Sequence, residues 1–169
     1  MTCRLSPHHT KRMKTLTITT NVEELHPSEL SEEQKTLADH AVRATYRSYS
    51  PYSHFSVGAA VQLADGTIVS GSNQENVAFP SGLCAERTAL FYANSRYPDQ
   101  PVSRLCIAAR DDKGRLTDSP ISPCGSCRQA LLETELRYKN PIEIVLVGAN
   151  SSYIIHSIHD LLPLCFDSF

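Results

Sequence analysis

Two short stretches, Cys84-Ala85-Glu86 and Pro123-Cys124-Gly125-Ser126-Cys127, decide how this 169-residue chain is interpreted. Each stretch reads as the start of a helix, and cysteines three residues apart share one helix face. The two helix starts can therefore bring three thiols to one metal ion, which also constrains the fold. Three protein ligands leave the fourth position of a tetrahedral zinc ion open for water, as in catalytic sites. Glu86, two residues from the first thiol, is placed to move protons during metal-assisted hydrolysis.

The charge of such a site predicts a further member. A helix start stabilises thiolates through its free amide groups and its dipole. Three thiolates together with the +2 charge of zinc leave about −1, and this excess opposes ionisation of a bound water. Arg87, directly after Glu86, is the candidate cation that restores the balance. The alternative is an ordinary solvated helix arginine.

Other interpretations of the thiols stay open. Cys-x-x-Cys alone could be a redox pair or half of a structural zinc site, and a structural site would have to recruit Cys3, Cys106 or a histidine. Cys106 stands in an apolar stretch and is expected to be a buried small hydrophobe. The seven histidines lie outside the two stretches and are interpreted as exposed or core residues. Glu86 taken alone would be a surface glutamate.

Composition indicates one globular domain. The chain is 41% hydrophobic, enough to bury a core, and its net charge of −2 offers no general attraction for nucleic acid or anionic membranes. No apolar run approaches the length of a membrane span. The basic N-terminus is not followed by the apolar segment of a secretory signal, so we expect a cytoplasmic protein with reduced thiols.

Hydrophobic periodicity predicts a single α/β domain over residues 15–169, preceded by a disordered tail, residues 1–14, in which Met13 could be an alternative start. The expected elements, in chain order, are a strand at 16–20, a helix opened by a Ser31/Gln34 capping box, a hairpin of strands at 55–63 and 68–69 around Asp65-Gly66, a helix from about Cys84, a strand at 105–109, a helix from Pro123 to about Leu136, strands at 142–147 and 153–155, and a short helical segment at 160–163.

Several motifs extend the two opening stretches. They are Pro-Tyr-Ser-His-Phe-Ser-Val-Gly-Ala-Ala at 51–60, Gly-Ser-Asn-Gln-Glu-Asn at 71–76, Cys-Ala-Glu-Arg-Thr-Ala-Leu at 84–90, Pro-Cys-Gly-Ser-Cys-Arg-Gln at 123–129 and Leu-Leu-Pro-x-x-Phe at 161–166. The Glu…Pro-Cys-x-x-Cys order is that of zinc nucleobase deaminases. Residues 31–169 thus resemble the cytidine deaminases of the small homotetrameric type.

This resemblance implies a fold and an activity. The fold is the three-layer cytidine-deaminase-like α/β fold, a central mixed sheet with helices on both faces. The activity is the zinc-dependent hydrolytic deamination of cytidine and deoxycytidine to uridine and deoxyuridine plus ammonia, in pyrimidine salvage. The implied partner is a small-molecule pyrimidine nucleoside, with no nucleic acid and no membrane. The implied assembly is a homotetramer with shared active sites.

The resemblance also implies roles for individual residues. For the metal, Cys84, Cys124 and Cys127 bind Zn2+, Glu86 is the catalytic acid and base, and Arg87 hydrogen-bonds the ligand sulfurs. For the substrate, Asn73 and Glu75 hold a ribose hydroxyl, Phe55 packs on the pyrimidine, the backbone of Ala85 contacts the base, and Phe166 closes a neighbouring subunit's site.

The residues themselves support these substrate roles unevenly. Asn73 and Glu75 stand two apart, so on an extended stretch both would face one side, although Asn-x-Glu also occurs in ordinary turns. Phe55 opens an apolar alternation and could equally be a core residue. Gln74 and Phe79 depart from the aliphatic residue and the tyrosine that are common in the family, which removes a hydroxyl from the surroundings of the ribose.

Two rival functions remain at this stage. One is another deaminase on the same scaffold, acting on an aminonucleoside such as blasticidin S or on a polynucleotide. The ribose pair Asn73/Glu75 favours a free nucleoside, and the weak basic character argues against a polynucleotide. The other is a zinc module used only for binding, which an intact Glu86 beside an open coordination position disfavours.

Overall fold

The computed structural model describes residues 13–168. Residues 1–12 and 169 lie outside the described residues, and so does most of the predicted N-terminal tail. Over the described residues the chain forms one six-stranded sheet, in the order β1-β6-β5-β4-β2-β3, and three α-helices. The strands are β1 (Glu23–Leu25), β2 (Ser56–Leu63), β3 (Ile68–Ser72), β4 (Val102–Arg110), β5 (Glu143–Val147) and β6 (Ser152–Ile155), and the helices are α1 (Glu32–Ala44), α2 (Ala85–Arg96) and α3 (Gly125–Tyr138).

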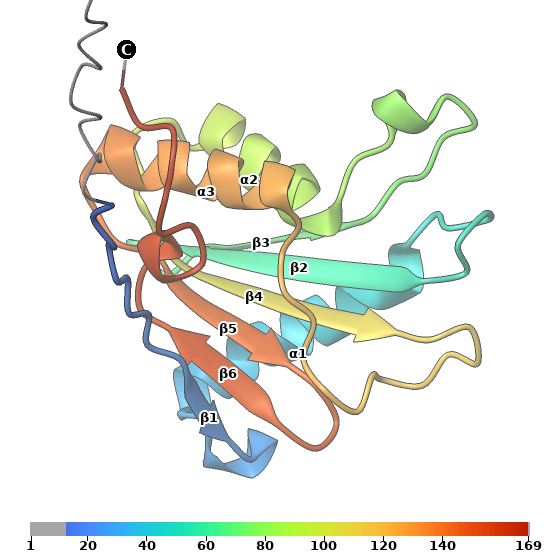
Figure 1. The fold of residues 1–169 in the computed structure, drawn as a ribbon. Coiled ribbons are helices and arrows are strands. Elements are labelled where there is room, and N and C mark those ends of the chain that lie inside the picture. The colour runs from blue at the N-terminus through green and yellow to red at the C-terminus, as the bar shows by residue number, and fades with distance from the viewer. Residues whose placement is uncertain (1–12, 169) are drawn as a thin grey trace, which may run out of the picture.

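The sheet is the middle one of three layers. Helices α2 and α3 cover one face of the sheet and α1 covers the other (Figure 1). Strands β4 and β5 are parallel, joined through α3, whereas the other neighbouring strands are antiparallel. The predicted α/β fold, with a central mixed sheet and helices on both faces, is confirmed.

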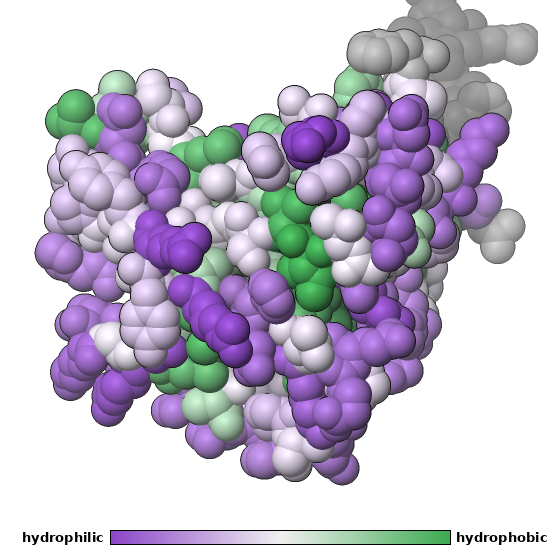
Figure 2. All heavy atoms as spheres, turned by 180° about the vertical axis from the view of Figure 1, so that it is seen from behind, coloured by the Kyte–Doolittle hydropathy of each residue, from purple (hydrophilic) through white to green (hydrophobic). Residues whose placement is uncertain are grey.

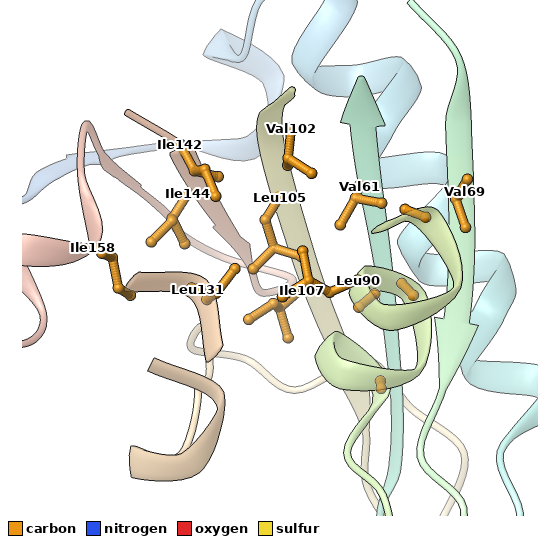
Figure 3. Packing of buried hydrophobic residues seen from close by; sticks show 14 of the residues in the cluster. Val61, Val69, Leu90, Val102, Leu105, Ile107, Leu131, Ile142, Ile144 and Ile158 are labelled. Atoms are coloured by element: carbon orange, nitrogen blue, oxygen red, sulfur yellow. The ribbon is translucent and has the colours of Figure 1, made fainter. Parts of the chain in front are cut away.

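Each face of the sheet has its own apolar cluster. The cluster beneath α2 and α3 is the larger, and Figure 3 shows side chains of β4, β5 and both helices meeting there, among them Leu90, Leu105, Ile107, Leu131 and Ile144. The cluster beneath α1 contains Leu37, Ala41, Ala60, Cys106 and Val145. Viewed from behind, the side on which α1 lies is mainly hydrophilic, with hydrophobic residues gathered in a strip near the middle of the view (Figure 2).

The local signals at the start of the domain are confirmed. The Oγ atom of Ser31 accepts from the backbone N–H of Gln34 at 3.2 Å, and the Oε1 atom of Gln34 accepts from the backbone N–H of Ser31 at 3.0 Å. Gly66, with φ of +87°, turns β2 into β3. In β2, however, both Ala59 and Ala60 are fully buried, because α1 covers the face that a one-sided alternation would leave to solvent.

The sheet order explains why two helices begin at one place. Strands β3 and β4 are both antiparallel to β2, so they run in the same direction and end at the same edge of the sheet. Helix α2 follows β3 and helix α3 follows β4. Each helix must return over the sheet from that edge, and their N-termini therefore lie together.

One glycine allows α2 to lie close to the sheet. A Cβ atom on Gly71 in β3 would lie 2.5 Å from the backbone N of Ala89 and 2.8 Å from the backbone O of Ala85. Real Cβ atoms do not approach backbone this closely, so only glycine at this position lets the first turns of α2 rest on β3. The start of α2 is fixed by this contact.

Three predicted boundaries are corrected. The strand predicted at 16–20 is wrong: Leu16 and Ile18 are exposed, and strand β1 forms instead at Glu23–Leu25, where β6 offers a partner. The helical segment predicted at 160–163 is a single 3-10 turn at Ile158–Asp160. Helix α3 begins at Gly125, two residues after the predicted Pro123. No helix among residues 13–168 is long and apolar enough to cross a membrane.

Candidate active site

Three thiols meet where α2 and α3 begin. Cys84 is the N-cap of α2, Cys124 is the N-cap of α3, and Cys127 lies in the first turn of α3. The sulfur of Cys124 lies 3.8 Å from that of Cys84 and 3.5 Å from that of Cys127. All three sulfurs lie within 4.8 Å of one another, and among the described residues no fourth His, Cys, Asp or Glu joins this group.

Cys106 lies too far from the three thiols to be a fourth metal ligand. Its side chain is fully buried in the cluster beneath α1, on the opposite face of the sheet from α2 and α3. Burial raises the pKa of the Cys106 thiol, which keeps it protonated and uncharged. Cys106 is a small core residue, as predicted, and the alternative of a closed four-ligand site at this residue is wrong.

Arg87 supplies the positive charge that the thiols need. Its Nη2 atom lies 3.9 Å from the sulfur of Cys84. Partial burial works against the charge of Arg87, but hydrogen bonds to Cys84 and Cys127 raise its pKa. The hydrogen bond from Cys127 and the nearby Arg87 lower the pKa of Cys84 to about 5, so Cys84 is a thiolate at neutral pH. The same shared proton raises the pKa of Cys127.

Glu86 is a buried carboxyl group next to the thiols. It lies in the first turn of α2, and only 4% of the residue is exposed. Burial raises the pKa of Glu86, and the charge on Cys84 adds to this effect. A carboxyl group whose pKa is raised towards neutrality can both accept and return a proton, which general acid–base catalysis requires.

A cavity of about 560 Å³ adjoins the thiols. Cys84 and Arg87 lie in its wall, and so do Asn73 and Glu75 from the segment that follows β3. The structure therefore brings the predicted ribose pair to the same cavity as Cys84, one of the three predicted metal ligands. The remaining lining residues are Tyr52, Ser53, Gln74, Asn76, Phe79, Gly82 and Leu83.

Glu75 is held by the loop that precedes β2. Its Oε2 atom accepts from the backbone N–H groups of Tyr52 at 2.9 Å and of Ser53 at 3.3 Å. Hydrogen bonds from the Ser53 side chain and the Tyr52 backbone lower the pKa of Glu75. Glu75 is thus ionised at neutral pH, and as a carboxylate it can only accept hydrogen bonds from a molecule in the cavity.

Asn73 is fixed by the beginning of β2. Its Oδ1 atom accepts from the backbone N–H of Val57 at 2.8 Å, and its Nδ2 atom donates to the backbone O of Phe55 at 2.9 Å. The second N–H of the amide remains as a donor. Asn73 and Glu75 together offer one donor and one acceptor, a combination that suits a hydroxyl group.

Glu86, Cys124 and Cys127 adjoin this cavity through Cys84 and are not themselves in its wall, and three residues predicted to bind the substrate also lie outside the wall. Phe55 is half-buried and Ala85 is fully buried. Phe166 is exposed, and its backbone O accepts a hydrogen bond of 2.8 Å from Gln129 on α3. Within one chain the structure thus holds Phe166 on the outer side of α3.

Several cavity residues were given no role from the sequence, and three of them, Tyr52, Ser53 and Phe79, shape the cavity wall. Tyr52 and Ser53 provide the backbone donors for Glu75, and Phe79 was noted only as a departure from the family pattern. The rings of Tyr52 and Phe79 meet edge to face at 6.0 Å and form an apolar wall. The signal available in the sequence was the turn at Pro51-Tyr52-Ser53, whose free N–H groups need an acceptor such as Glu75.

The donor set fits zinc. Three sulfurs at helix N-termini, one of them with a strongly lowered pKa, are soft anionic ligands of the kind that zinc prefers. The three sulfurs leave a coordination position for water, and Glu86 lies beside them. The cluster can therefore hold a zinc ion in a catalytic arrangement.

Comparisons with known proteins agree with this site. The family model described as the cytidine and deoxycytidylate deaminase zinc-binding region matches residues 31–140. The chain is 39% identical over 101 residues to a cytidine deaminase of Halalkalibacterium halodurans, which covers 60% of this chain and 71% of the relative. It is 38% identical over 133 residues to a cytidine deaminase of Mycobacterium tuberculosis, which covers 77% of this chain and 86% of the relative.

A solved structure shows the same fold. The crystal structure of cytidine deaminase from Burkholderia pseudomallei superposes with a TM-score of 0.67 at 34% identity, covering 81% of this chain and all of the other. The matched region contains the three thiols, Glu86 and the cavity wall. This chain belongs to the cytidine and deoxycytidylate deaminase family.

Proposed function

We propose that this protein catalyses the hydrolytic deamination of cytidine and deoxycytidine, which gives uridine and deoxyuridine plus ammonia. The observation that carries the proposal is the buried carboxyl group of Glu86 beside a three-thiol cluster, one thiol of which, Cys84, lines the cavity. The family membership supports the same activity. The role in pyrimidine salvage and the location in the cytoplasm are parts of this proposal.

Cys84, Cys124 and Cys127 would hold the zinc ion, and Arg87 would balance their charge. Zinc bound there supplies a Lewis acid that makes a coordinated water acidic at neutral pH. The N-termini of α2 and α3 stabilise the anionic sulfurs, so that the cluster keeps its ligands deprotonated. Arg87 reduces the excess negative charge that would otherwise oppose loss of the water proton.

Glu86 would carry the proton through the reaction. It accepts the proton of the attacking water and delivers it to N3 of the cytosine ring as the water oxygen bonds to C4. The second water proton moves, through Glu86, to the amino group as the C4–N bond breaks. One water is consumed, ammonia leaves, and Glu86 returns to its starting state.

The cavity wall would select a free nucleoside. Asn73 can donate to a ribose hydroxyl and Glu75 can accept from it, so the pair holds one hydroxyl from both sides. Phe55 is proposed to pack on the pyrimidine, and the backbone of Ala85 to contact the base. Phe166, exposed on the outside of one chain, is proposed to close the site of a neighbouring subunit in a homotetramer with shared active sites.

The test is an ultraviolet assay of the full chain loaded with one equivalent of zinc. Cytidine, deoxycytidine, CMP and blasticidin S are compared, before and after zinc is removed with a chelator and restored. We expect zinc-dependent loss of cytidine and deoxycytidine. Turnover of blasticidin S alone would favour the rival aminonucleoside deaminase, and stoichiometric zinc without turnover of any of the four would favour a zinc module used for binding.

A further inference from the structure

The amide of Asn73 can present only one group to the cavity, because the protein occupies the rest. An amide oxygen accepts two hydrogen bonds and an amide nitrogen donates two. The nitrogen gives one N–H to the backbone O of Phe55, and one direction of the oxygen is taken by the backbone N–H of Val57. The state of the second oxygen direction therefore decides whether Asn73 acts purely as a donor.

Ser48 occupies that second direction. This residue is half-buried and follows the 3-10 turn at Thr45–Arg47. Its Oγ atom lies 2.5 Å from Oδ1 of Asn73, and because that oxygen can only accept, the single hydroxyl proton of Ser48 goes to it. The Oγ atom of Ser50 lies 3.1 Å from that of Ser48. It also lies 3.3 Å from the Oγ atom of Ser56 in β2.

We propose that Ser48 is a positioning residue for substrate binding: its hydroxyl saturates the amide oxygen of Asn73, so that the remaining N–H is the only group that Asn73 offers to the ribose. This inference rests on the proposed function. With Ser48 in place, Asn73 donates and Glu75 accepts, and a hydroxyl group satisfies both. Without Ser48, the free direction of the oxygen takes a water or competes for the substrate proton that Glu75 should accept.

Removing the hydroxyl should weaken substrate binding and leave the chemistry almost unchanged. We expect Ser48→Ala to raise KM for cytidine about fivefold, the size expected for one hydrogen bond, with kcat within about twofold of the wild type. The effect should disappear with 2′,3′-dideoxycytidine, measured as a substrate or as a competitive inhibitor, because this nucleoside lacks the hydroxyl that Asn73 and Glu75 hold. Ser48→Thr, which keeps a hydroxyl, should restore the wild-type KM.

Ser50→Ala is the matched control, since it removes a neighbouring hydroxyl of the same loop that makes no contact with Asn73; its KM should stay within about twofold. In an Asn73→Ala background, Ser48→Ala should cause no further change in KM. If Ser48→Ala is insoluble, Ser48→Cys takes its place, because a thiol keeps the size but donates only weakly.

An unchanged KM for cytidine in Ser48→Ala overturns the inference. So does an equal loss for cytidine and dideoxycytidine, or an additive loss in the Asn73→Ala background, since each indicates a general disturbance of the loop. These outcomes presuppose an active wild type. A wild type that deaminates none of the nucleosides contradicts the proposed function instead.

Discussion

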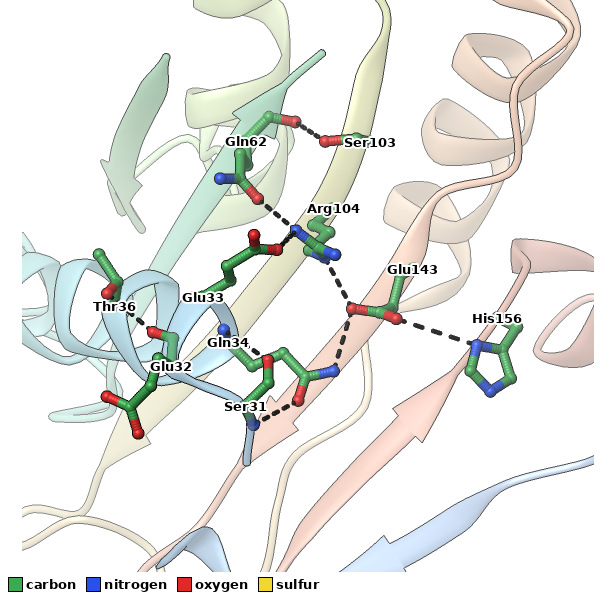
Figure 4. Close-up of polar contacts among 10 residues, drawn as sticks. All are labelled: Ser31, Glu32, Glu33, Gln34, Thr36, Gln62, Ser103, Arg104, Glu143 and His156. Carbon is green, nitrogen blue, oxygen red and sulfur yellow. Dashed lines mark hydrogen bonds and ion pairs between the residues drawn. The ribbon is translucent and has the colours of Figure 1, made fainter. Parts of the chain in front are cut away.

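The two ends of the sheet carry polar clusters of opposite character. At the end where β3 and β4 finish, three sulfurs, Arg87 and the buried Glu86 crowd together. At the other end, where β4 and β5 begin, Arg104 binds the carboxylates of Glu143 at 2.9 Å and Glu33 at 2.6 Å (Figure 4).

In the second cluster, which we call the Arg104 network, the polar groups find their partners within the cluster. Arg104 also donates to the side chain of Gln62 at 3.0 Å, and Glu143 accepts from the side chain of Gln34 at 3.1 Å. Each of its charged groups has an ion-pair or hydrogen-bond partner within the chain, and the network ties α1 to three strands. The thiol cluster is not matched in this way: the Nε atom of Arg87 is buried without a hydrogen-bond partner.

The difference teaches how to tell a functional cluster from a structural one. Both contain an arginine and acidic groups, so composition does not separate them. In the Arg104 network the opposite charges are paired, whereas the thiol cluster combines a lowered pKa at Cys84 with a raised pKa at Glu86. Divergent pKa values in neighbouring groups are typical of catalytic sites.

The largest expected effect comes from removing a ligand. Cys124→Ala should lose both the bound zinc and the activity, because two thiols do not hold the ion in the required geometry. Zinc content per chain, measured by inductively coupled plasma mass spectrometry, and the cytidine assay check this. Cys165→Ala, which removes a thiol outside the cluster, should keep one zinc per chain. A Cys124→Ala protein that retains zinc and turnover would contradict the ligand assignment.

Glu86→Gln should separate the metal from the chemistry. The amide keeps the size of the side chain but cannot accept a proton, so we expect activity to fall by about 10³-fold or more while one zinc stays bound. The measurements are kcat for cytidine and zinc content, with a melting curve as the control for folding. Near-normal kcat in this variant would remove Glu86 from the mechanism.

Arg104→Ala should do the reverse and cost stability without abolishing activity. It removes the cation that Glu33 and Glu143 share and leaves Glu143 with only the hydrogen bond from Gln34 and the more distant His156. Because the side chains of Arg104 and Glu143 are only 28% and 23% exposed, we expect a loss of about 2 kcal/mol in the free energy of unfolding. Arg43→Ala is the matched control, because its pair with Asp39 is exposed at both ends and should contribute under about 0.5 kcal/mol. Urea unfolding measures both; equal losses would show that the Arg104 network is not structural.

The smallest effect concerns the edge of the same network. Glu23 raises the pKa of His156, with Glu143 and Asp160 adding to the shift. A raised pKa means that this contribution to stability is fully present below the unfolded value of about 6.5 and is lost as the pH rises through the folded value. His156→Asn should therefore destabilise the protein by a few tenths of a kcal/mol at pH 6 and by nothing at pH 8.5. The urea midpoints of the wild type and of His156→Asn, measured at both pH values, show whether the loss of stability occurs at pH 6 and is absent at pH 8.5.

Much of the fold could be predicted because its signals are local. The Ser31/Gln34 capping box and the Asp65-Gly66 turn depend on neighbours in the sequence. Strand β1 could not be placed, because Leu16 and Ile18 carry the better alternation while the position of an edge strand depends on where β6 offers hydrogen bonds. The double-sided burial of β2 likewise depends on α1.

In the candidate site, too, the features with a local sequence signal could be predicted, and those that depend on distant segments could not. The three cysteines proposed as ligands and Glu86 follow from a spacing pattern, and the structure brings their side chains together as that pattern predicts. The contact between Ser48 and Asn73 joins residues 25 apart, and no periodic signal marks it. Likewise, the donors for Glu75 come from a loop more than 20 residues earlier in the chain. Contacts of this kind appear only once β2 and β3 are paired.

The separation of β3 from β4 by β2 would give a metal ion bound by the proposed ligands a part in folding. Cys84 and Cys124 are 40 residues apart in the chain, and their strands are joined only through the intervening hairpin strand. An ion held by both cysteines would close that loop as a covalent crosslink does, and for 40 residues the lost chain entropy raises the free energy of the unfolded ensemble by about 4 kcal/mol. Retention of zinc is therefore a sensitive reporter of whether the β2–β3 hairpin has docked on β4.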